Sequence, residues 1–147
     1  MNEKVKAYEL FVKQCATLME EDMIANMANL SAAINEFLNG INWVGFYIMR
    51  NGELVLGPFQ GKPACVRIKI GDGVCGRAVE KKKTLVVPNV HEFPGHIACD
   101  SNTNSEIVVP IEREDDIIGV LDIDSTELNR FDEIDAKYLK RITNLIK

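Results

Sequence analysis

The stretch WVGFYIMRNGELVL, residues 43–56, decides the fold of this chain. It holds two runs of the aliphatic and aromatic residues that favour β-strands, residues 43–49 and 53–56, on either side of Asn51 and Gly52. Asn-Gly between two such runs is the strongest short signal for a β-hairpin. The sequence therefore predicts a pair of antiparallel strands here.

Two amphipathic helices are predicted before this hairpin. Apolar residues recur at helical spacing over residues 5–19 and again, from Ile24 to Phe37, in the next segment. Asp22 has the side chain and the position of an N-cap for the second helix. Cys15 lies on the apolar stripe of the first helix, and we expect it to be a small core residue, because free cysteine is among the most buried residue types.

The segments after the hairpin predict a mixed domain. The last helix is expected to begin at Asp132, and residues 88–104 form a long loop without periodicity, of a length that is usually functional or disordered. Helices at both ends of a mostly antiparallel sheet define the α+β class, and we expect a single domain over residues 1–147. The strands expected downstream are residues 66–70, 84–87, 106–111 and 116–124, with a short helix after the Gly71-Asp72-Gly73 turn.

Composition narrows the classes of function. The net charge of −5 at pH 7, with acids and bases interspersed, argues against nucleic acid as a partner. No apolar run approaches the ~20 residues that span a bilayer, and the N-terminus lacks the apolar region of a signal peptide. We therefore expect a cytoplasmic protein without a membrane partner, whose four cysteines are catalytic, sensory, metal-binding or buried rather than permanently disulfide-bonded.

Three cysteines lie in segments rich in Gly, Pro and His. Cys65, Cys75 and Cys99 in such segments indicate redox chemistry, because accessible thiols of low pKa react as thiolates. The same cysteines with His91 and His96 could hold zinc, since thiolate and imidazole are its usual ligands. No C-x-x-C pair is present and the cysteines are widely spread, so the spacing predicts no metal site.

Two aspartates continue an apolar stripe on the last predicted strand. Alternation of side chains places Asp122 and Asp124 on the same face as Ile118 and Val120. Burying an ionised carboxylate is costly without water or a cation, and antiparallel pairing could bring Glu106 near Asp122. A cluster of three acids would suit an ammonium group. The alternative is an exposed strand end.

The first strand of the hairpin carries two aromatic rings on one face. Trp43, Gly45 and Tyr47 alternate onto this face, so the missing side chain at Gly45 could leave a slot for a small apolar group between the rings. Ordinary core packing is the alternative.

The turn Gly71-Asp72-Gly73 leads into a helix whose first backbone N–H groups are free. Such groups can bind an anion such as a carboxylate. Glycines also serve tight turns, and no phosphate-binding lysine motif accompanies them.

Taken together, these segments resemble the free methionine-R-sulfoxide reductases, a family of small GAF-domain enzymes. The resemblance covers nearly the whole chain and implies a GAF-like fold. It also implies reduction of free L-methionine (R)-S-oxide to L-methionine by cysteine chemistry, with no cofactor. The most specific segments are NWVGFY at 42–47, GVCG at 73–76, GHIACD at 95–100, NSEIV at 104–108 and GVLDIDS at 119–125.

The resemblance also implies roles for single residues. The sulfenic acid formed on the attacking cysteine would condense with the resolving cysteine, and thioredoxin would return both to thiols. A cluster of carboxylates raises the pKa of at least one member, so Glu106 or Asp124 could donate the proton that the sulfoxide oxygen needs. The implied roles are attack on the substrate for Cys99, resolution for Cys65, a less settled part for Cys75, binding of the substrate amino group for Glu106, Asp122 and Asp124, and contact with the methyl end for Trp43 and Tyr47.

Family resemblance further suggests a homodimer. Two other interpretations stay open at this point. One is a GAF module that senses a small ligand or an oxidant without turnover, although such modules usually sit in longer chains and no effector segment follows the last helix. The other is a zinc-stabilised structural protein.

Overall fold

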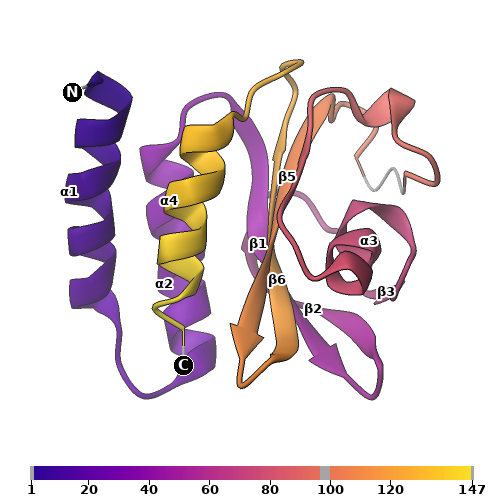
Figure 1. Cartoon of the computed structure of the whole chain (residues 1–147), viewed down its shortest axis with the longest axis horizontal. Helices are drawn as coiled ribbons and strands as arrows, with labels where there is room; N and C mark the ends of the chain where they lie inside the picture. Colours follow the sequence, from indigo (N-terminus) through magenta and orange to yellow (C-terminus); the bar gives the residue numbers. More distant parts are fainter. Residues whose placement is uncertain (1, 97–99, 147) are drawn as a thin grey trace.

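The computed structural model describes residues 2–96 and 100–146, and these form a sheet with helices on both faces (Figure 1). Helices α2 and α4 pack on one face of the sheet, α1 packs against these two helices on the side away from the sheet, and α3 with its neighbouring loops lies on the other face of the sheet. Within the described ranges, no helix combines the length and the apolar character that crossing a membrane requires. The helices are α1 (Glu3–Leu18), α2 (Met23–Phe37), α3 (Gly73–Lys81) and α4 (Glu133–Thr143), with a 3-10 turn at Val90–Glu92.

The sheet has six strands in the order β3-β2-β1-β6-β5-β4, and every neighbouring pair is antiparallel. The predicted hairpin is confirmed: Arg50 pairs with Glu53, and Asn51 and Gly52 between them have φ angles of 52° and 82°. Both angles lie in the left-handed region that a tight primed turn demands. The strands are β1 (Ile41–Arg50), β2 (Glu53–Gln60), β3 (Arg67–Lys69), β4 (Leu85–Val87), β5 (Ser105–Arg113) and β6 (Asp116–Ser125). The α+β class with helices at both ends is as predicted.

Each face of the sheet carries its own core. Phe46 and Leu121 belong to the core under the three helices, whereas Tyr47 and Val120 belong to the core under α3. This division follows from the alternation of side chains along β1 and β6. Of the described α-helices, the short α3 is the one that lies over the face that carries Tyr47. This face is therefore only partly covered by helix, which leaves room for a site.

The first two helices form largely as expected. Cys15 is fully buried in the helix-side core, and the Asp22 carboxylate accepts a hydrogen bond from the Ala25 N–H and caps α2. Ile24, the first residue of the apolar pattern that predicted the second helix, has a side chain that is 44% exposed, and Met23 packs against the core instead. The N-cap at Asp132 is confirmed and forms a capping box with Asp135.

The alternation predicted for β6 fails at one position. Ile118 was expected on the face of Val120, but it packs against the helix-side core, and Ile117 packs on the other side. The register between β5 and β6 shifts at this point, since Ile111 pairs with Gly119 and Glu112 pairs with Ile117. A bulge of this kind inserts one residue and reverses the faces on its far side.

A buried carboxylate ties the first helix to the last. The Asp135 side chain is fully buried, accepts a hydrogen bond of 2.5 Å from the Tyr8 hydroxyl, and lies 2.8 Å from the Lys4 ammonium. Arg130 is 3.9 Å from the same carboxylate. Because a buried carboxylate is costly unless it is paired, this cluster holds α1 against α4.

We expect Tyr8→Phe to lower the free energy of unfolding by about 1.5–3 kcal/mol, because it removes a hydrogen bond to a buried charged group. Urea unfolding followed by circular dichroism measures this. The control is Tyr138→Phe, which removes a bond of 2.6 Å to Glu9, a half-exposed acid, and should cost less. Equal losses in the two variants would contradict the role given to Asp135.

Candidate active site

Strand register brings three carboxyl groups to one face of the sheet. Glu106 on β5 pairs directly with Asp124 on β6, and Asp124 pairs with Trp43 on β1. Asp122 lies two residues earlier on β6, opposite Gly45, and so points to the same side. The acids that the sequence placed on one stripe thus come together near the start of β5 and the end of β6, where Glu106 and Asp122 are buried rather than at an exposed strand end.

These acids line a cavity of about 40 Å³ between the sheet and its cover. A water molecule needs at least about 10–15 Å³ of such space, so the cavity has room for only a few waters. Its cover comes from residues 62–64 and from the start of α3, residues 72–75, and Trp43 and Tyr47 form part of its wall. The arrangement is a small acidic pocket that is partly open to solvent.

None of the three carboxyl groups forms an ion pair with a Lys or Arg side chain among the residues that the structure describes, although Lys62 lines the same cavity. Glu106 and Asp122 are each only 6% exposed, and one oxygen of Asp122 and one of Asp124 are buried without a described hydrogen-bond partner. Burial is the main cause that raises the pKa of each of the three groups well above its ordinary value, and their mutual repulsion raises it further. Protons therefore stay on this cluster to unusually high pH.

The ring of His96 lies beside the cluster. Its Nε2 atom is 3.6 Å from Oε1 of Glu106. Burial lowers the pKa of this histidine, so near neutral pH the ring is uncharged and does not balance the acids. A cationic ligand would supply the positive charge that His96 does not.

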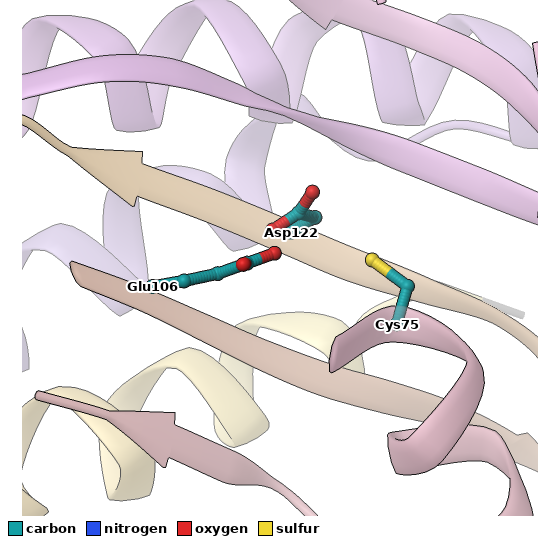
Figure 2. Close-up of side chains that lie close together, drawn as sticks. All are labelled: Cys75, Glu106 and Asp122. Carbon is teal, nitrogen blue, oxygen red and sulfur yellow. The ribbon is translucent and has the colours of Figure 1, made fainter. Parts of the chain in front are cut away.

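Cys75 enters the same pocket from α3. Its thiol points toward the carboxyl groups of Asp122 and Glu106 (Figure 2) and is hydrogen-bonded to Asp122. Burial, followed by the charge of Asp122, raises the pKa of Cys75 well above its usual value. The sequence suggested an accessible thiol of low pKa; the structure instead places Cys75 on a helix, buried and protonated near neutral pH.

Cys65 and Cys99 are the other two cysteines for which the sequence predicted redox chemistry. Cys65 is disulfide-bonded, and its backbone carbonyl accepts a hydrogen bond of 2.9 Å from the Tyr47 hydroxyl. Trp43 donates from Nε1 to the Lys62 carbonyl at 3.1 Å, so both aromatic residues hold the loop that covers the cavity. Cys99 lies outside the described residues.

The slot expected at Gly45 is not present. The Trp43 and Tyr47 rings lie 6.0 Å apart between centroids, and a Cβ atom placed on Gly45 would lie 2.3 Å from the Cβ of Phe59. Phe59 on β2 thus fills the space that glycine leaves, and it stacks on Trp43 at 5.2 Å. Glycine is required here for close packing of β1 against β2, while the two predicted rings still line the cavity.

Sequence reasoning missed a polar group at the rim of the cavity. The Asn42 amide donates hydrogen bonds of 3.1 Å to both Asp100 and Thr103, and its oxygen is buried without a described partner. Asp100 and Thr103 line the cavity. Only the position of Asn42, next to Trp43, could have pointed to it.

The sequence also raised two other possible sites, a zinc site that includes His91 and an anion site at the start of α3. His91 is exposed, and its ring bonds to the Asn104 side chain at 2.8 Å rather than lining the cavity, so it does not join Cys75 in a zinc site. At the start of α3, Asp72 makes no side-chain cap, and Gly73 and Val74 line the cavity. Backbone N–H groups in the first turn of a helix lack partners within the helix.

The fold and the pocket between the sheet and α3 define a GAF domain. The family model described as "GAF domain" matches residues 27–147. The chain is 52% identical to the free methionine-R-sulfoxide reductase of Escherichia coli (strain K12), over 84% of this chain and 74% of that protein.

Solved structures extend the likeness. The fRMsr of Staphylococcus aureus in its reduced form is 56% identical, covers 95% of this chain and 92% of its own, and has a TM-score of 0.91. The free methionine-R-sulfoxide reductase of Neisseria meningitidis in complex with its substrate is 45% identical, covers 99% and 89%, and has a TM-score of 0.94. The chain therefore belongs to the GAF-domain free methionine-R-sulfoxide reductase family, a family of oxidoreductases.

We expect Asp122→Asn to stabilise the ligand-free protein, by about 1–3 kcal/mol near pH 8, because the neutral amide avoids the free-energy cost of keeping a proton on the buried carboxyl group or of burying its charge. The gain should shrink toward pH 5. A carboxyl group with a raised pKa in the folded state destabilises the fold as pH rises above its unfolded value of about 4, where the unfolded chain binds fewer protons. Urea unfolding at both pH values measures this.

The matched control is Asp116→Asn, at the exposed start of the same strand, which should change stability little at either pH. A gain from Asp122→Asn that is absent, or equal at both pH values, would contradict the account of the acidic pocket.

Proposed function

We propose that this protein reduces free L-methionine (R)-S-oxide to L-methionine, as a single catalytic GAF-like domain. The observation that carries the proposal is the acidic pocket: three carboxyl groups at one cavity, two of them with a buried oxygen that has no described partner, and none of them ion-paired with a Lys or Arg side chain among the described residues. Family membership supports the reaction, since the related enzymes of known name are free methionine-R-sulfoxide reductases.

The carboxyl groups of Glu106, Asp122 and Asp124 bind the ammonium group of the substrate. An ammonium has three N–H donors, and the pocket offers oxygens from two neighbouring strands to receive them. Arrival of the cation lowers the pKa of the acids and releases protons from them. The cost of holding like charges together in the free protein is offset when this ligand binds.

The rest of the substrate fits the remaining walls. Trp43 and Tyr47 present apolar surface for the methyl end of the side chain. The uncapped first turn of α3, at Gly73 and Val74, supports binding of the substrate carboxylate by backbone N–H groups. In this arrangement a free amino acid presents its ammonium group to the acids, whereas a methionine sulfoxide within a polypeptide has only an amide nitrogen in that place.

The chemistry uses the thiols of Cys99 and Cys65. The Cys99 thiolate attacks the sulfoxide sulfur, the oxygen passes to the cysteine as a sulfenic acid, and methionine leaves reduced by two electrons. The Cys65 thiol then displaces the oxygen as water and forms a disulfide with Cys99, which thioredoxin reduces by thiol–disulfide exchange. No cofactor takes part in this scheme.

A carboxylic acid of the pocket supplies the proton that the sulfoxide oxygen needs. Glu106 and Asp124 both have a raised pKa, so either group carries a proton near neutral pH. Glu106→Gln separates the two roles: loss of binding with an unchanged single-turnover rate at saturating substrate would make Glu106 a binding group and not the acid.

We also propose that two copies of the chain form a homodimer. The layer of α1 and α2 supports this, because Leu10, Leu18 and Ile24 on its surface are large apolar side chains exposed to solvent. Light scattering after size-exclusion chromatography measures the mass of the particle, which should be twice that of one chain. The mass of one chain would refute this part of the proposal.

With the R epimer of free methionine sulfoxide and dithiothreitol, the wild type should form methionine and Cys99→Ser should fall to background, because the attacking sulfur is gone. Cys65→Ser should form one methionine per chain in a single turnover but lose thioredoxin-dependent turnover. Cys15→Ser, in the helix-side core, is the control and should retain turnover. Comparable product from wild type and Cys99→Ser would remove Cys99 from the mechanism.

Acetylation of the substrate amino group should lower kcat/KM by about 10³-fold or more, since each lost hydrogen bond to a charged group costs about 1.5–3 kcal/mol. Steady-state kinetics on free and N-acetyl methionine sulfoxide measure the ratio. The ratio should shrink in Glu106→Gln, whose amide has already weakened ammonium binding. Equal kcat/KM for both substrates would exclude recognition of the ammonium.

A further inference from the structure

We propose that the reduced protein binds one zinc ion through Cys75, Glu106 and Asp122, and that zinc and the substrate ammonium exclude each other from the pocket. The exclusion rests on the proposed function; the binding of zinc does not. This ligand set combines one cysteine with two carboxylates, whereas the zinc site considered from the sequence used histidines and cysteines alone.

The distances suit a single ion. One ligand atom from each residue, the Cys75 sulfur and one carboxylate oxygen from each acid, lies within 4.8 Å of the other two. Figure 2 shows the three side chains converging from α3, β5 and β6. Zinc bonds of about 2.3 Å to sulfur and about 2.0–2.2 Å to oxygen require only a small further approach.

Burial distinguishes this group from the acidic clusters that are common on surfaces. All three residues are buried, and one oxygen of Asp122, at the cavity wall, has no described hydrogen-bond partner. An oxygen of Asp124 in the same cavity is also unpartnered. A cation bound by Asp122 would satisfy the first of these oxygens.

The sulfur selects the kind of cation. An ammonium group needs only oxygen acceptors, so binding of an ammonium does not account for a thiol at this position. Thiolate with carboxylates is a donor set for zinc, whereas calcium and magnesium take oxygen ligands alone. Three protein ligands leave a fourth position, for water or for His96, whose Nε2 is 3.6 Å from Glu106.

The test measures zinc on metal-free protein that is kept reduced with a phosphine. Titration against a chromogenic chelator should give one zinc per chain, and Cys75→Ala and Asp122→Asn should each weaken binding by about 100-fold or more. Cys15→Ala, the other buried cysteine, is the matched control and should bind as wild type. Cobalt in place of zinc should show a thiolate charge-transfer band that Cys75→Ala loses.

A second variant separates this site from the reactive thiols. The double variant Cys65→Ser, Cys99→Ser should keep its zinc. Loss of zinc from this double variant, retention in Cys75→Ala, or no zinc bound in an equimolar mixture at micromolar concentration would each overturn the proposed site.

Methionine, which carries the same ammonium, should weaken zinc binding in proportion to its occupancy. If zinc binds through Cys75 but methionine does not compete, the zinc site stands and the ammonium assignment fails. If methionine binds and zinc does not, the zinc site fails alone.

Discussion

Three carboxyl groups confined to one small cavity impose the constraint on which the rest of this structure depends. Glu106, Asp122 and Asp124 are brought together by the pairing of β5 with β6, and burial raises the pKa of all three. Such a cluster opposes folding near neutral pH, because charge on it is neither solvated nor paired. The rest of the domain must therefore supply the free energy of folding that offsets the cost of this cluster.

The division of labour between the two faces follows from that constraint. The face under α1, α2 and α4 is a continuous apolar core, closed by the buried Asp135 cluster between the first and last helices. Among the described residues the opposite face is covered by α3 and loops, and Trp43 and Tyr47 anchor one of these loops by hydrogen bonds to the carbonyls of Lys62 and Cys65. The apolar core on the helix side thus stabilises a domain whose other face carries the acidic pocket. Proteins commonly give up stability at a site in this way where function needs it.

Local patterns in the sequence were enough for the elements and for the shared face of the acids. The Asn51-Gly52 turn and the caps at Asp22 and Asp132 are set by neighbouring residues, so they could be predicted. Contacts between distant segments could not: the bulge that turns Ile118 and the ring of Phe59 over Gly45 both depend on strand register. For the same reason the burial of Cys75 against Asp122 had no signal in the spacing of cysteines.

Calorimetric titration of L-methionine into the reduced, metal-free protein, in buffers of different ionisation enthalpy near neutral pH, tests the central claim most directly. Because the cluster holds protons that an arriving ammonium displaces, binding should release protons to the buffer. The amino-free analogue of methionine should bind far more weakly and release none. Methionine binding without proton release, with equal affinity for the analogue, would contradict the account of the acidic pocket.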